Sequence, residues 1–216
     1  MKTDSFEKSY EGRQVLVCPD LDLRPGVVTA LIGANGSGKS TLAKVLVGLE
    51  QPDDRNWRRP EGRIGYLPQK SFAFRLTTEG NVLLGGSDRN RARELMAALG
   101  LEELRSHRAK RLSGGETAKM ALARVLMGSY DLVILDEPTA AMDMESTLAA
   151  EELMVDYAQK RQAAVLLITH NLQQARRVAE EAIFLSRGSL VEQGPAATVL
   201  EHPTQEETRR FLEFYG

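Results

Sequence analysis

The stretch that decides the fold is Gly33-Ala34-Asn35-Gly36-Ser37-Gly38-Lys39-Ser40. It matches the pattern G-x-x-x-x-G-K-[ST] in full, and it lies between an apolar run at 27–32 and a helical pattern at 40–47. Glycines let the backbone wrap closely around an anion and point successive N–H groups at it. The N-terminus of the following helix adds partial positive charge. The stretch therefore predicts a phosphate-binding loop between a buried strand and a helix, against the alternative of an accidental glycine-rich turn.

A second stretch, Leu132-Val133-Ile134-Leu135-Asp136-Glu137, reads as an apolar strand that ends in two carboxylates. In a phosphate site, Lys39 would reach the β- and γ-phosphates, and Ser40 and Asp136 would hold Mg²⁺. Glu137 points differently from Asp136 and is positioned to orient or deprotonate an attacking water. A base beside the terminal phosphate favours hydrolysis. The alternative, a solvated turn at 136–138, is weakened by the phosphate loop upstream.

The order of elements predicts an α/β fold with a P-loop NTPase core, a largely parallel sheet, N-terminal antiparallel β-strands and an inserted α-helical subdomain. Buried strands are expected at 27–32, 64–67, 132–135 and 164–168, and a closing hairpin at 182–185 and 189–191. Edge strands are expected within 6–23, and a polar loop around 52–60. Helices are expected at 40–47, 91–99, 118–127 and 206–214. The prediction is a single domain over 1–216, with the helical subdomain at 70–129.

The composition limits the class of protein. The chain has 216 residues, 42% hydrophobic and 27% charged, with a net charge of −2. This is typical of a folded globular protein and argues against one that coats nucleic acid. Cys18 is the single cysteine, which excludes an intramolecular disulfide. Without an apolar run near the ~20 residues of a membrane span, or an apolar signal region, we expect a cytoplasmic protein that serves a membrane only through another polypeptide.

A second glycine motif, Leu112-Ser113-Gly114-Gly115-Glu116, precedes the helical pattern at 118–127 and predicts a second anion site at a helix start. One nucleotide does not need two such sites on one chain. With this motif the sequence resembles the ATP-binding subunits of ABC transporters, over essentially its whole length. In that family the signature motif of one subunit closes on ATP held by the P-loop of another. The resemblance therefore implies an ATPase that works as a homodimer with two-fold symmetry.

The resemblance also implies roles for individual residues. Gln69 matches the Q-loop glutamine, which contacts Mg²⁺ and the attacking water, and His170 matches the switch histidine at the γ-phosphate. Residues 140–143 match the D-loop at the dimer interface. The residues implied to be catalytic are Glu137, His170 and Gln69, and those implied to hold Mg²⁺ are Ser40, Gln69 and Asp136. Those implied to bind ATP are Tyr10, Gly33, Asn35, Gly36, Ser37, Gly38, Lys39, Ser40, Thr41, Ser113, Gly114, Gly115 and Glu116.

Several positions depart from the family pattern. Glu116 replaces the commoner glutamine, Met142 replaces the usual D-loop leucine, and Asn171 follows His170 where aspartate is common. The groups implied to touch nucleotide or water are all retained, so an active ATPase is predicted. Tyr10 resembles the aromatic residue that stacks on adenine, with plain packing as its alternative.

The resemblance further implies partners: a transmembrane permease, and an extracellular substrate-binding protein if the system is an importer. Phe72, Phe74, Arg75 and Leu76 are candidates for the surface that docks the permease, or else belong to the core of the helical lobe. Location is then peripheral, on the inner face of the membrane. A non-transport ABC ATPase of DNA repair or translation is the rival, but the coiled coils or zinc modules of that class are missing and no nucleic acid partner is expected.

The substrate is less determined. The short loop 48–69 and residues 114–117 resemble zinc-importer ATPases, whereas residues 136–143 and 209–215 resemble importers of the tungstate type. The sequence favours tungstate or a related oxyanion, with zinc as the alternative.

Overall fold

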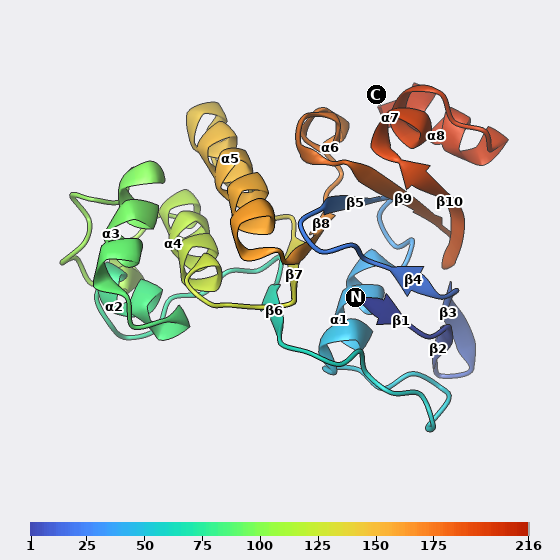
Figure 1. The fold of residues 1–216 in the computed structure, drawn as a ribbon, viewed down its shortest axis with the longest axis horizontal. Helices are drawn as coiled ribbons and strands as arrows, with labels where there is room; N and C mark the ends of the chain where they lie inside the picture. Colours follow the sequence, from blue (N-terminus) through green and yellow to red (C-terminus); the bar gives the residue numbers. More distant parts are fainter. Residues whose placement is uncertain (216) are drawn as a thin grey trace.

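A twisted eight-stranded sheet runs through the molecule in the computed structural model, which describes residues 1–215 (Figure 1). Its strand order is β2-β3-β10-β9-β5-β8-β7-β6. The strands are β2 (Phe6–Tyr10), β3 (Arg13–Cys18), β5 (Val28–Ile32), β6 (Ile64–Leu67), β7 (Leu132–Asp136), β8 (Ala164–Ile168), β9 (Glu181–Ser186) and β10 (Ser189–Pro195). A separate antiparallel pair is formed by β1 (Lys2–Thr3) and β4 (Leu21–Asp22).

The strand pairing confirms the predicted α/β class. Strands β6, β7, β8, β5 and β9 pair in parallel, and every residue of β5, β7 and β8 is buried. Strands β9 and β10 form the predicted antiparallel hairpin, and β2 and β3 form an antiparallel pair at the opposite edge from β6. Apolar runs without alternation are typical of strands covered on both faces.

Helices cover both faces of the sheet. They are α1 (Lys39–Val47), α2 (Thr78–Val82), α3 (Arg89–Ala98), α4 (Gly114–Leu126), α5 (Met144–Arg161), α6 (Leu172–Val178), α7 (Ala196–Glu201) and α8 (Glu206–Tyr215), with 3₁₀ turns η1 (Leu83–Gly85) and η2 (Ala109–Arg111). Alternate residues of β7 serve different cores: Val133 lies in the core with α4 and α5, while Ile134 lies in the core with α1. The sheet is therefore buried on both faces, and loops follow the carboxyl ends of its strands.

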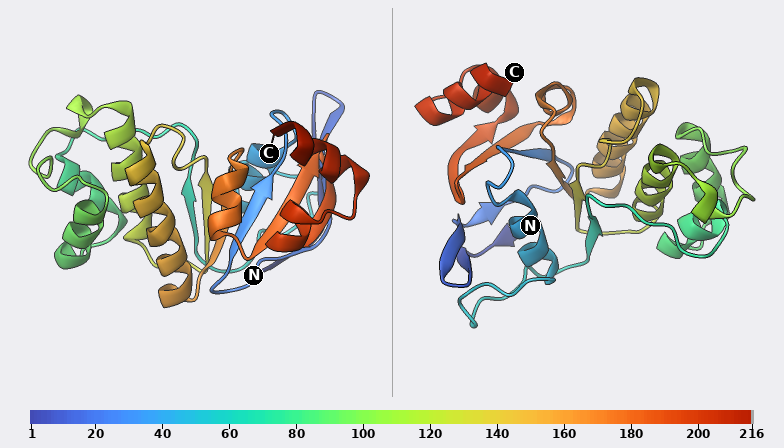
Figure 2. Two further views of the ribbon diagram at one scale, coloured as in Figure 1. Left: turned by 90° about the horizontal axis from the view of Figure 1, so that it is seen from above. Right: turned by 180° about the vertical axis from the view of Figure 1, so that it is seen from behind.

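Between β6 and β7 the chain is helical, as the sequence indicates. Helices α2, α3 and α4 stand together at one end of the molecule, beyond α5 (Figures 1 and 2). Over residues 68–131 the structure has one β-bridge, Thr77 with Arg108, and no regular strand. This arrangement supports the proposal that 70–129 is an inserted subdomain; the exact boundaries stay a prediction.

Helix α4 starts earlier than the sequence pattern indicates, at Gly114 rather than at 118. The Ser113 hydroxyl accepts a hydrogen bond from the Glu116 N–H at 3.3 Å, and the Glu116 carboxylate accepts one from the Ser113 N–H at 2.7 Å. This reciprocal capping box satisfies two backbone donors at the helix start. The glycines of the signature motif therefore form the first turn of α4 and not a loop before it, which corrects the expected boundary.

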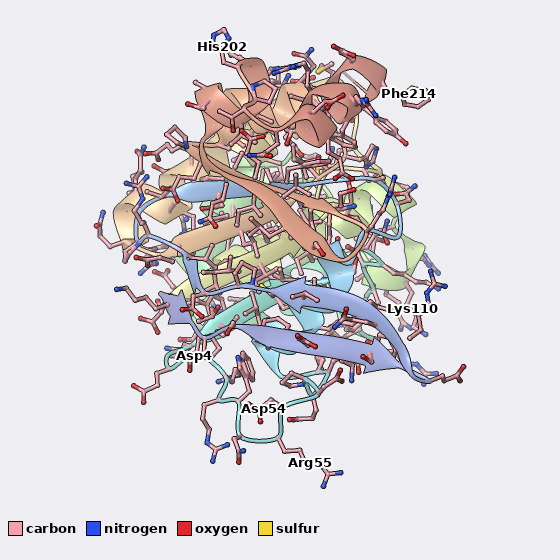
Figure 3. The ribbon with its side chains drawn as sticks, turned by 90° about the vertical axis from the view of Figure 1, so that its right-hand side faces the viewer. Asp4, Asp54, Arg55, Lys110, His202 and Phe214 are labelled. Carbon is pink, nitrogen blue, oxygen red and sulfur yellow. The ribbon has the colours of Figure 1, made fainter. Side chains whose placement is uncertain are left out.

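Other differences are smaller. The helix predicted at 91–99 is α3, which begins at Arg89 behind its Asp88 cap, and the last helix α8 continues to Tyr215. Helices α5, α6 and α7 have no counterpart among the predicted helices. The polar loop around 52–60 is confirmed, and Asp54 and Arg55 project from it at one extreme of the molecule (Figure 3). Among the residues described, no helix combines the length and apolar character that crossing a bilayer requires.

Candidate functional site

The phosphate loop lies between β5 and α1, at the carboxyl edge of the sheet. Gly33 has φ +152°, and a Cβ at this position would lie 2.1 Å from the Leu185 carbonyl oxygen. Gly38 caps α1 with φ +106°. Only glycine fits both positions, because each needs a backbone that L-residues rarely adopt and Gly33 also has no room for a side chain. The fold thus fixes the loop that the sequence predicts.

Lys39 is buried within this loop. Its ammonium donates to the carbonyl oxygens of Gly33 at 2.7 Å and Ala34 at 2.9 Å. Burial lowers the pKa of Lys39, and the nearby carboxylates of Glu137 and Asp136 oppose that shift. A compact cation on a flexible stem, held against the loop, suits contact with phosphate oxygens.

Asp136 ends β7 and is only 3% exposed. Burial raises the pKa of Asp136, while the nearby Ser40 hydroxyl and the charge of Lys39 act in the opposite direction. A hydroxyl beside a carboxylate fits Mg²⁺, which binds through one or two protein oxygens plus waters and phosphates. The described residues contain no cluster of three or more His, Cys, Asp or Glu side chains suited to a metal.

A cavity of about 310 Å³ gathers most of the predicted site. Its lining residues are Val15, Asn35, Gly36, Gly38, Lys39, Ser40, Thr41, Gln69, Asp136 and Glu137. Gln69 comes from the segment that follows β6, Asp136 ends β7, and Glu137 begins the turn after it. The structure thus brings together three segments that lie far apart in the sequence. Val15, on β3, is an addition: the mixed pattern of residues 6–23 gave no signal for it.

Glu137 and His170 meet although 33 residues separate them. The Glu137 Oε1 atom lies 2.7 Å from His170 Nδ1 and accepts the His170 backbone N–H at 3.1 Å. Glu137 has φ 53°, in the left-handed region, and its N–H donates to the Ile168 carbonyl oxygen. A non-glycine residue in this region costs about 1–3 kcal/mol and is enriched at functional sites. Both side chains also line a neighbouring hollow of about 430 Å³.

Tyr10 lies at the edge of the site and does not line its cavity. It is 39% exposed at the end of β2, with the side chains of Thr41 and Glu50 nearby, and Lys8 Nζ lies 4.9 Å from the centre of its ring. Burial and the Glu50 charge raise the pKa of Tyr10. Contact with Thr41 brings the ring next to the start of α1, where a base attached to bound phosphates could stack on it.

The signature motif does not line this cavity. Ser113 and Gly114 are exposed at the start of α4, in the helical part of the molecule, on the far side of β6 and β7 from α1 (Figure 1). The Glu116 carboxylate is engaged with the Ser113 N–H, and this bond lowers the pKa of Glu116. Within one chain the two predicted anion sites therefore remain apart.

The signature helix instead contacts residues 140–143 of its own chain. A Cβ at Gly115 would lie 2.7 Å from the Ala141 carbonyl oxygen, so α4 packs closely on this turn. Lys119, which the sequence reasoning did not select as a site residue, pairs with Asp143 at 3.8 Å. Asp143 in turn caps α5 through the Ser146 N–H. The signature motif at 112–116 and the turn at 140–143 thus form one continuous surface.

The fold and this cavity define a P-loop nucleotide hydrolase. A protein-family profile described as "ABC transporter" matches residues 18–140. The chain belongs to this family and is an ATP-binding subunit of the transporter type, which confirms the predicted family and its ATPase activity.

Relatives with named substrates are similar over nearly the whole chain. A tungstate uptake system ATP-binding protein from Peptoclostridium acidaminophilum is 36% identical over 87% of this chain and 95% of its own length. A zinc import ATP-binding protein from Halorhodospira halophila is also 36% identical, over 90% of this chain and 77% of its own length. A solved structure of an ABC transporter ATP-binding subunit superposes with a TM-score of 0.82 at 24% identity, and the match covers 98% of each chain.

Proposed function

We propose that this protein hydrolyses ATP to drive solute import, as one of two identical subunits on a membrane permease. The observation that carries the proposal is the single cavity that combines the phosphate loop, Asp136, Gln69 and Glu137. Relatives named as import subunits support the direction of transport. We place the protein on the inner face of the membrane, held there by its permease.

Binding uses groups that the fold has already oriented. Backbone N–H groups of the loop, the start of α1 and the Lys39 ammonium would neutralise phosphate charge. Ser40, Asp136 and Gln69 would hold Mg²⁺, which neutralises charge that develops on the β- and γ-phosphates. The Tyr10 ring would stack on adenine. Each of these contacts is assigned to a residue of this chain by its position in or beside the cavity.

The chemical step needs a water molecule in line with the γ-phosphate. Glu137 lies at the wall of the cavity and its carboxylate is held by His170, so it would orient this water and accept its proton. His170 would sense the γ-phosphate through the same contact. Because the strained backbone of Glu137 is fixed between β7 and β8, little reorganisation is required when the nucleotide binds.

The signature motif, the second predicted anion site, would complete the ATP cavity of another copy of the chain. Ser113 and Gly114 are exposed and Gly115 is half-buried at the start of α4, so a second copy turned by a two-fold axis would supply them to the first copy's ATP. ATP would hold such a dimer together, and loss of the γ-phosphate would release it. Glu116 contributes indirectly, because its carboxylate keeps Ser113 in the capping position.

Exposed aromatic side chains favour the docking interpretation of residues 72–76 over the core interpretation. Phe72 is 51% exposed, and Phe74 and Leu76 are each 44% exposed. The Arg124 guanidinium lies 5.2 Å from the centre of each phenylalanine ring and also donates to the Phe72 carbonyl oxygen. A groove beside them continues along Leu84 and Tyr130. Rigid exposed aromatic residues with an arginine are typical of interface anchors.

We expect the double substitution Phe74→Ser and Leu76→Ser to abolish co-purification with the permease and to leave ATP affinity unchanged, because the groove lies outside the ATP cavity. Pull-down with the permease of its transport system, together with fluorescent-nucleotide titration, measures both effects. Leu49→Ser and Phe214→Ser remove exposed apolar side chains elsewhere on the surface and serve as controls. Phe214 lies at the surface near the end of the chain (Figure 3). Undiminished permease binding by the groove variant would exclude this surface as the docking site.

We further propose tungstate or a related oxyanion as the transported substrate, on the likeness of residues 136–143 and 209–215 to the tungstate type. The zinc and tungstate relatives share the same 36% identity with this chain, so overall identity does not separate the two substrates. The substrate contacts other subunits of the system, not the ATPase.

The substrate is therefore tested on the substrate-binding protein proposed to belong to the same transport system. Calorimetric titration with tungstate, molybdate and Zn²⁺ is expected to show tight binding of an oxyanion and none of zinc. Tight zinc binding without oxyanion binding would contradict the oxyanion proposal and favour the zinc alternative.

A further inference from the structure

The turn that joins β7 to α5 carries Glu137, the proposed base for ATP hydrolysis. Glu137 begins it and Asp143 ends it, as the cap of α5. Two backbone hydrogen bonds hold the turn itself, from the Ala140 N–H to the Glu137 carbonyl oxygen at 3.3 Å and from the Met142 N–H to that of Thr139 at 2.9 Å. Between its two ends, Thr139 is the residue whose side chain can form ordinary hydrogen bonds. Thr139 is therefore the residue through which the rest of the protein can hold this turn by a side-chain hydrogen bond.

Gln174 of α6 donates this hydrogen bond. Its side chain is fully buried, and its amide nitrogen Nε2 donates to Thr139 Oγ1 at 2.9 Å and to Glu151 Oε1 at 3.2 Å. A carboxylate can only accept hydrogen bonds, so Glu151 fixes which end of the amide faces it. The amide is consequently held in the orientation that donates to Thr139.

Glu151 of α5 is itself immobilised. It is 4% exposed, and the Arg177 guanidinium of α6 donates one hydrogen bond to each of its two carboxylate oxygens, each at 2.7 Å. This pairing raises the pKa of Arg177. A buried carboxylate with a two-pronged guanidinium partner has a well-defined position, and removal of either partner would leave the other charge uncompensated. A continuous set of hydrogen bonds thus runs from Arg177 through Glu151 and Gln174 to Thr139, two residues beyond Glu137.

The set of hydrogen bonds also borders the candidate site. Thr139 and Arg177 line the same hollow as Glu137 and His170, on the side of Glu137 away from the phosphate loop. Glu137 is therefore held from two directions, by His170 directly and by the anchored turn. The turn also presents Ala140 and Ala141, which are exposed beside the signature helix.

We propose that Gln174 is a positioning residue for ATP hydrolysis: through Thr139 it holds residues 137–143 in place, with Glu151 and Arg177 fixing its amide. The inference rests on the proposed function, because it assumes that Glu137 activates the water. It requires loss of the Thr139–Gln174 bond to lower the turnover number, kcat, and to leave the KM for ATP unchanged. The phosphate loop and α1, which bind the nucleotide, share no residue with these hydrogen bonds.

The first test replaces Thr139. Thr139→Val keeps the shape of the side chain and removes the hydroxyl, and we expect kcat to fall about threefold to tenfold, the effect of one hydrogen bond of ordinary net strength. Thr139→Ser restores a hydroxyl and is expected to recover most of the wild-type kcat. Thr208→Val, at a buried threonine of α8 that lines neither hollow of the candidate site, controls for a hydroxyl-to-methyl change. Thermal unfolding of each variant shows that it is folded.

The second test is a double-mutant cycle. Gln174→Leu is expected to lower kcat at least as much as Thr139→Val, because it also removes the donor to Glu151. The double variant should be no slower than the slower single variant, because both changes remove the same Thr139–Gln174 bond. Multiplying effects in the double variant, an unchanged kcat in Thr139→Val, or a raised KM with unchanged kcat would each overturn the positioning role. Absence of Mg²⁺-dependent ATPase activity in the wild-type protein with its permease would instead overturn the proposed function.

Discussion

Replacement of Glu137 by glutamine is expected to lower kcat for ATP hydrolysis by about 10²- to 10⁴-fold, the usual contribution of a positioned general base. Glutamine has the same shape but cannot accept the proton of the attacking water. The phosphate loop, Ser40 and Asp136 are unchanged, so the variant should bind ATP with wild-type affinity. Phosphate release measures the first effect and fluorescent-nucleotide titration the second.

A consequence of the same variant is a trapped dimer. If ATP joins two chains and hydrolysis releases them, Glu137→Gln should elute as a dimer in ATP and as a monomer without nucleotide. Light scattering after size exclusion measures this. Glu201→Gln removes an exposed carboxylate on α7 and serves as the matched control. Wild-type turnover in Glu137→Gln would remove Glu137 from the role of base.

Replacement of Lys39 by methionine is expected to weaken ATP binding by about 10- to 100-fold and to abolish measurable turnover. Methionine retains the apolar part of the buried Lys39 side chain but loses its charge. Hydrogen bonds to a charged group contribute about 1.5–3 kcal/mol each, so losing them should weaken binding by this factor. The exposed Lys160, on α5, gives the control substitution Lys160→Met. Nucleotide affinity equal to wild type would contradict the assignment of Lys39 to the phosphates.

The Lys39 variant also tests whether the site is shared between chains. Ser113→Asp keeps a residue that caps helices well and adds negative charge where phosphate would approach. A dimer of one Lys39→Met chain and one Ser113→Asp chain would contain one intact site. We expect the mixture of these two inactive variants to hydrolyse ATP, and Ser113→Thr to remain active alone. No activity in the mixture would argue against a site built from two chains.

Much of the fold could be predicted from local patterns. Strands β5, β7 and β8 are continuous apolar runs because both of their faces are buried. The phosphate loop needs glycine at Gly33 and Gly38 because both have a positive φ, which is a local requirement, whereas the Leu185 carbonyl oxygen that leaves no room for a side chain at Gly33 is a tertiary neighbour. Helix α4 shows the limit of such patterns. Its apolar periodicity begins four residues after the helix does, because a capping box and not burial determines its start.

The candidate site, too, has parts that the sequence predicts and parts that only the tertiary structure shows. The phosphate loop and the Asp136-Glu137 pair are each contiguous in sequence, so their chemistry could be predicted before their geometry was known. The contact between Glu137 and His170 joins the ends of β7 and β8, and it exists only because those strands are neighbours in the sheet. Exposure of Phe72 and Phe74 was equally undecided, since an aromatic pair in a helical lobe can face either the core or the surface.

The sequence by itself determined the class of protein, and it predicted the nucleotide and the residues proposed to touch its phosphates, because those functions rest on short motifs whose backbone requirements are local. The tertiary structure alone decided which distant groups act together: His170 with Glu137, Gln174 with Thr139, and the signature helix with the turn at 140–143. It also decided that the signature motif lies away from the cavity of its own chain. These relations depend on strand order and helix packing, and no local pattern encodes the separation in space of two segments that are distant in sequence.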